Sequence, residues 1–146
     1  MKLDLLLGRV VRQIFMEAGE GRMRFVCEDG DNIEFVTDGD CCSETWFADI
    51  VGVTALIGHP ITIAEEVEVP ELLDGRCRQE SDSFYGFRMF TQKGCCDAIY
   101  RNSSNGYYGG DCTLLVNGAG ERWGSRFTLP GIDATDWKEI TEDFSA

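Results

Sequence analysis

The chain has 146 residues, 26 of them acidic and 13 basic, and its net charge of −13 argues against nucleic-acid binding that depends on neutralising phosphates. An apolar content of 43% is typical of a folded protein, and the length suits a single domain. No apolar run reaches the ~18 residues of a membrane span, and the N-terminus is too charged for a secretion signal. We therefore expect a cytoplasmic protein that does not bind membranes.

Most of the chain predicts antiparallel strands joined by tight turns. Alternating apolar and polar residues, bounded by Asp-Gly and other glycine-bearing turns, are typical of hairpins. The predicted strands span residues 8–17, 22–29, 31–39, 59–69, 83–94 and 95–102, with one or two more between 109 and 131. Residues 70–82 are polar and predict a connecting loop.

Two segments predict helices instead. Residues 43–51 begin with Ser43 and an acidic residue, and their large apolar residues (Trp46, Phe47 and Ile50) follow at helical intervals. Gly52 would end this short helix. The acidic tail, about 133–146, has an aspartate cap and apolar residues at i, i+3 and i+7, which predicts an amphipathic C-terminal helix. The fold class predicted is therefore α+β, mainly an antiparallel β-sheet with one short internal helix and a C-terminal helix, in a single domain over residues 1–146.

The residues with reactive side chains do not form a recognisable catalytic or metal-binding motif. The seven cysteines include two adjacent pairs, Cys41-Cys42 and Cys95-Cys96, whose spacing differs from the C-x2-4-C of structural zinc sites. Buried thiols explain them more simply, although zinc stays an alternative. His59 is the single histidine, which disfavours histidine-based catalysis. We expect no catalytic residue, no metal and no cofactor.

The segment YRNSSNGYYGG, residues 100–110, is the strongest candidate binding site. An Asn-Gly pair predicts a tight turn, but a turn alone does not explain so many small polar residues around it. Glycines allow close approach of a ligand, polar side chains donate to phosphate and ribose oxygens, and tyrosine faces stack on bases. The two alternatives are a plain turn and a ligand loop that uses Arg101, Asn102, Ser103, Ser104, Asn105, Tyr107 and Tyr108.

Two other aromatic positions lie in contexts that could bind a ligand. Trp123 stands between Arg122 and Arg126, so its ring could stack on an adenine between two cations, or it could cover the core. Phe84 and its neighbour Tyr85 precede a glycine and have the same two alternatives. The adjacent glutamates at 65 and 66 are expected to form a solvated strand face.

Two motifs resemble a family of small bacteriophage proteins of unknown function: DCCSETWF, residues 40–47, and YRNSSNGYYGG. The resemblance covers about residues 8–116 and leaves out the acidic tail. Size and loop chemistry are also similar to the Thoeris anti-defence sponges, which sequester cyclic ADP-ribose signals. That similarity implies a homo-oligomer in an infected bacterial cell, with Arg101, Asn102, Asn105 and Tyr107 near a subunit interface.

Three functions are open to this sequence. The first is a sponge that binds a cyclic nucleotide signal of the cyclic ADP-ribose type without cleaving it. The second is an acidic DNA mimic that inhibits a host defence nuclease, as some anti-CRISPR proteins do. The third, a hydrolase of a nucleotide signal, is disfavoured by the single histidine and the lack of a metal-ligand cluster. We therefore expect a binding protein and not an enzyme.

Overall fold

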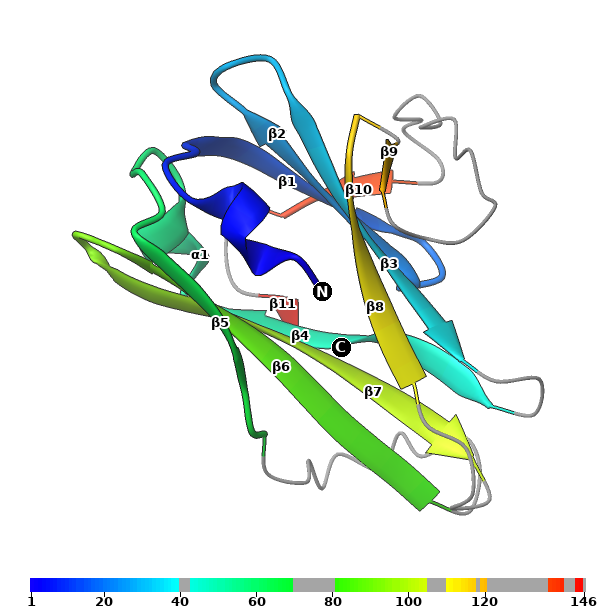
Figure 1. The fold of residues 1–146 in the computed structure, drawn as a ribbon. Coiled ribbons are helices and arrows are strands. Elements are labelled where there is room, and N and C mark those ends of the chain that lie inside the picture. Colours follow the sequence, from blue (N-terminus) through cyan, green and yellow to red (C-terminus); the bar gives the residue numbers. More distant parts are fainter. Residues whose placement is uncertain are drawn as a thin grey trace.

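The computed structural model describes residues 1–39, 43–69, 81–104, 110–117, 119–120, 137–140 and 144–145. Two antiparallel sheets pack face to face in it, with short helices at one end (Figure 1). The elements are η1 (Leu3–Leu6), β1 (Val11–Glu17), β2 (Arg22–Cys27), β3 (Asn32–Gly39), β4 (Glu44–Val51), α1 (Val53–Leu56), β5 (Ile63–Val67), β6 (Ser81–Thr91), β7 (Gly94–Ser104), β8 (Gly110–Val116), β9 (Ala119–Gly120), β10 (Trp137–Glu139) and β11 (Phe144–Ser145).

The strands divide into a six-stranded sheet, in the order β10-β1-β2-β3-β8-β9, and a five-stranded sheet, in the order β11-β4-β7-β6-β5. The core lies between them. The ring of Phe35 in β3 meets Phe25 of its own sheet edge-on at 4.9 Å and stacks on Phe87 of the other sheet at 4.8 Å. Leu3 and Leu6 of η1 are buried in the same core. Among the described residues, no helix is long and apolar enough to cross a membrane.

The prediction of a helix at 43–51 is wrong, because this segment is β4. A register shift between Phe47 and Asp49 inserts an extra residue into the strand. Phe47 pairs with Tyr100 and Ile50 with Ala98, which lie two residues apart on β7, so both apolar side chains face the core although they are three residues apart on β4. A bulged strand therefore imitates the i, i+3 spacing of a helix.

The single α-helix of the described residues, α1, begins after Gly52, where the sequence predicted a helix to end. Gly52 has φ 90°, and a side chain there would collide with the carbonyl of Cys95. Only glycine adopts this conformation freely and leaves room for that carbonyl. The glycine therefore lets the chain turn sharply from β4 into α1.

The predicted C-terminal helix is also wrong. Residues 137–139 form β10 on the edge of β1, and residues 144–145 form β11 on the edge of β4. Trp137 lies under the guanidinium of Arg24 at 4.9 Å, whereas Ile140 is buried in the core. The apolar residues of the tail thus serve separate contacts, and the fold is an almost wholly antiparallel β structure. The remaining predicted strands, including the hairpin across residues 92–94, are confirmed where the structure describes them, whereas residues 121–131 lie outside the described residues. The predicted loop at 70–82 extends too far, because β6 already begins at Ser81.

Candidate functional site

The segment expected to be a loop begins as a strand. β7 continues through Arg101, Asn102 and Ser103 to Ser104, paired with β6 on one side and β4 on the other. Arg101 and Asn102 are 1% exposed and Ser103 is fully buried. The structure therefore extends the predicted strand 95–102 to Ser104 and buries Arg101, Asn102 and Ser103 within the sheet, although these residues were also candidates for a ligand loop.

Arg101 lies in a row of side chains that crosses three strands. Its guanidinium is 5.3 Å from the ring of Trp46 in β4 and 4.6 Å from the ring of Phe84 in β6. Both residues stand opposite Arg101 in the strand register. A cation shielded from water between two rings is strongly held, so this arginine contributes to the fold. Phe84 itself is half-buried.

Asn102 points to the other side of the same strand. Its Nδ2 donates a hydrogen bond of 2.9 Å to Oγ1 of Thr45. Asn105, Tyr107, Tyr108, Arg122, Trp123 and Arg126 lie outside the described residues.

A hollow opens where β5 separates from β6. The two strands pair only as far as Val67 and Gly86, whereas β6 continues to Ser81 against β7. A side chain at Gly86 would stand 2.5 Å from Cγ2 of Val69, so the glycine lets the chain after β5 pass closely. The hollow has a volume of about 340 Å³ and is lined by Glu66, Val67, Glu68, Phe84, Tyr85, Gly86 and Tyr100. We call this site the aromatic hollow.

Two tyrosines link the aromatic hollow to the candidate loop. The rings of Tyr85 and Tyr100 stack at 5.1 Å, from paired positions on β6 and β7. The Tyr85 hydroxyl accepts a hydrogen bond of 3.3 Å from the backbone N–H of Gly110. Tyr100 belongs to β7 and Gly110 begins β8, so Tyr85 in the aromatic hollow contacts both of these strands.

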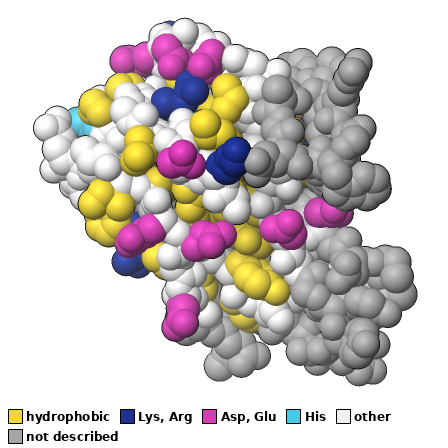
Figure 2. Space-filling model, viewed as in Figure 1, with side chains coloured by type: hydrophobic (Ala, Val, Ile, Leu, Met, Phe, Trp, Pro, Cys, Tyr) yellow, Lys and Arg dark blue, Asp and Glu magenta, His cyan; other side chains and the backbone are white. Residues whose placement is uncertain are grey.

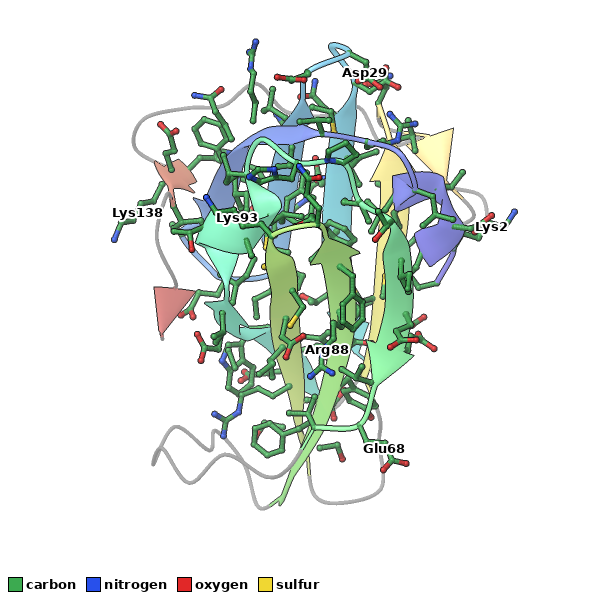
Figure 3. The ribbon with its side chains drawn as sticks, turned by 90° about the vertical axis from the view of Figure 1, so that its left-hand side faces the viewer. Lys2, Asp29, Glu68, Arg88, Lys93 and Lys138 are labelled. Atoms are coloured by element: carbon green, nitrogen blue, oxygen red, sulfur yellow. The ribbon has the colours of Figure 1, made fainter. Side chains whose placement is uncertain are left out.

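The charge of the aromatic hollow is negative in the described part of its lining. Glu66 and Glu68 are exposed, and Figure 3 shows Glu68 projecting outward from the end of the β5 segment. Burial raises the pKa of Tyr100, and the neighbouring Cys112 raises it further, so its hydroxyl stays protonated at neutral pH. Rings, carboxylates and phenols suit a flat ligand that carries hydroxyl or amino donors, whereas carboxylates repel a phosphate placed next to them.

Among the described residues, neither a cysteine nor the histidine lines the aromatic hollow. These residues contain no group of three or more His, Cys, Asp or Glu that could hold a metal ion. Cys27, Cys96 and Cys112 are buried free thiols, and Cys95 is an exposed one. Cys95 and Cys96 point to opposite sides because they are adjacent on a strand. Nδ1 of His59 lies 3.5 Å from Nε2 of Gln92.

The sequence did not single out most of the lining of the aromatic hollow. Glu66 was expected to form a solvated face, and Glu68 and Tyr100 were not considered as site residues. Two signals were present in the sequence SFYGF: adjacent aromatic residues, and a glycine within a strand, which marks close approach of another segment. The sequence does not show which segment approaches Gly86, because that approach depends on the tertiary structure.

Comparisons with known proteins give one family match. Neither the curated proteins nor the solved structures compared with this chain give a match. A family model described as "Domain of unknown function (DUF7448)" matches residues 4–114, from within η1 into β8. This match covers more than half of the chain, and the protein therefore belongs to the family of the domain of unknown function DUF7448.

Proposed function

We propose that the protein is a non-catalytic binding protein that captures a nucleotide signal, with the nucleoside part of the ligand in the aromatic hollow. The observation that carries this proposal is the lining, in which Phe84, Tyr85 and Tyr100 stand together with two glutamates. Its volume of about 340 Å³ is at the lower end of the range for small-molecule sites.

The lining matches a nucleoside in chemistry. Stacking of a base on an aromatic side chain contributes ~1–3 kcal/mol. Carboxylates accept hydrogen bonds from ribose hydroxyls and from the amino groups of bases. In this proposal the exposed carboxylates of Glu66 and Glu68 accept such bonds, and the phosphates of the ligand point away from them. Sequestering a signal requires tight binding and no bond cleavage.

More specifically, we propose a bacteriophage anti-defence protein that acts as a homo-oligomer. It would sequester a host signal of the cyclic ADP-ribose type. This proposal is supported by the resemblance of the two motifs to phage proteins and by the presence of Tyr100, the first residue of the second motif, in the lining of the aromatic hollow. The phosphates of such a ligand require positive charge, for which Arg122 and Arg126 are the nearest candidates in sequence to β8. Arg101 is not part of this proposal, because its guanidinium lies between two protein rings.

The first experiment mixes the purified protein with adenosine, AMP and cyclic ADP-ribose isomers, and follows thermal unfolding. A ligand that binds only the native state raises the unfolding temperature. Chromatography of the ligand before and after heat denaturation then shows whether it is recovered intact. We expect stabilisation with intact ligand. A chemically changed ligand would contradict the proposal and indicate an enzyme, and no stabilisation by any nucleotide would favour the acidic inhibitor.

Isosteric variants locate the binding site. Glu66→Gln and Glu68→Gln remove a charge from the rim without changing side-chain size. A hydrogen bond to a charged group contributes ~1.5–3 kcal/mol, so we expect each variant to weaken binding by about tenfold or more. Glu65→Gln is the matched control, because Glu65 is exposed on the same strand and does not line the aromatic hollow. Equal affinity in all three variants would place the ligand elsewhere.

A further inference from the structure

No strand of the described residues pairs with the outer edge of β5. β5 ends the order of its five-stranded sheet, with β6 on one side and no described strand on the other. Ile63 is 50% exposed, and the side chains at 65, 66 and 68 are exposed glutamates. An unpaired strand edge presents backbone N–H and C=O groups that can bind another extended segment.

Exposed apolar side chains also occur in and next to η1, which contacts β5. η1 lies against β5, and Leu5 and Leu7 are 39% and 48% exposed. Figure 2 shows yellow apolar and magenta acidic side chains mixed over the face that carries η1 and β5. The edge therefore combines backbone pairing groups, apolar surface and negative charge.

The charges decide which class of partner fits. A second copy paired through β5 would bring the glutamates of two chains, each with a net charge of −13, close together. The phosphates of a nucleic acid would be repelled in the same way. Arg88, the basic residue opposite Glu65 on β6, is already bound to Asp97 by two hydrogen bonds of 2.6 and 2.9 Å. The glutamates thus favour positive charge from outside the chain.

We propose that the β5 edge binds an extended basic segment of a partner protein as an added antiparallel strand. When the added strand runs antiparallel to β5, four consecutive residues of the partner stand opposite Glu66, Glu65, Ala64 and Ile63. The sequence that fits is therefore basic, basic, any residue, apolar. The two basic side chains neutralise the glutamates, and the apolar side chain covers Ile63. Every strand pair described in this sheet is antiparallel, which makes the added strand continuous with it.

The test uses a fluorescent peptide with the core Arg-Lys-Thr-Ile and fluorescence anisotropy with the full chain. We expect saturable binding that weakens as salt is added, because exposed charges are screened. A peptide with the same residues and alternate backbone N-methyl groups cannot form the strand ladder, so we expect it to bind at least about tenfold more weakly. Equal binding of the two peptides would overturn the proposal, as would no binding of the unmodified peptide.

A charge reversal tests the position. Glu65→Lys is expected to lower affinity by about tenfold or more, since it places like charges opposite each other. Glu28→Lys is the matched control, with the same charge change at an exposed position next to β2, in the other sheet, and unchanged affinity expected. Thermal unfolding of both variants checks that they fold. Equal loss in both variants would mean general charge attraction and would refute an edge site. Adenosine binding is measured in parallel, so that failure of the nucleotide proposal is recognised separately.

Discussion

Replacing Arg101 by alanine should destabilise the protein strongly. The guanidinium is 1% exposed and lies within 5.3 Å of Trp46 and 4.6 Å of Phe84. Each contact of a desolvated cation with a ring contributes ~1–2 kcal/mol, and the buried stem of the side chain adds to this. We expect the free energy of unfolding to fall by about 2–4 kcal/mol. For a chain of this size, that corresponds to a decrease of about 4–16 °C in the unfolding temperature.

Urea unfolding, followed by tryptophan fluorescence, measures the loss directly. Arg88→Ala is the control, because Arg88 is on the neighbouring strand with its side chain 37% exposed, and solvent screens its ion pair with Asp97. We expect a much smaller loss there. Arg101→Lys should fall between wild type and alanine, since an ammonium keeps the charge but not the planar stacking. If Arg101→Ala unfolds like wild type and loses nucleotide binding instead, Arg101 contacts the ligand and the reasoning fails.

Three further predictions concern buried groups. Glu34 is fully buried and ion-paired with Arg22 and Arg24. Glu34→Ala should therefore lower the free energy of unfolding, measured in urea, by about 3–5 kcal/mol. A loss below ~1 kcal/mol would contradict a structural role for these three residues. Burial raises the pKa of Cys27 to about 11 from its usual value of 9.0. The stability contributed by this buried thiol is therefore complete below pH 9 and is lost as the pH rises through 11. Between these pH values, the unfolding temperature of Cys27→Ala should change less with pH than that of the wild type. At pH 8, an alkylating reagent should modify the exposed Cys95 in the folded protein and Cys27 only after unfolding; similar rates for the two thiols would contradict the burial of Cys27.

Local patterns were sufficient to predict most strands. The Asp-Gly turn before β3 and the turn at residues 92–94 are set by neighbours in the sequence, and both hairpins are confirmed. The errors have non-local causes. The bulge near Ala48 shifts the phase of β4, and its position depends on the pairing with β7. The tail pairs with β1 and β4, which lie far away in the sequence, so its apolar spacing carried no information about those partners.

The candidate site was predictable only in part. Residues 101–104 are poor in strand formers and the predicted strand ends at 102, yet β4 and β6 flank this segment and extend the pairing to Ser104. Arg101 was a reasonable ligand candidate by residue type, but the sequence does not reveal that Trp46 and Phe84 stand on either side of it. The aromatic hollow depends on the separation of β5 from β6, which follows from the three-dimensional course of the chain after Val67.

The positions of β10 and β11 have a consequence for synthesis in the cell. β1 and β4 are translated long before the residues that cover their edges, since Phe15 pairs with Glu139 and Asp49 with Ser145. At ~5–20 residues per second, these edges stay open on the ribosome for several seconds. An open edge pairs readily with other chains. A nascent chain cut before Trp137 would expose the β1 and β4 edges together, and such a product would be expected to aggregate before its binding properties could matter.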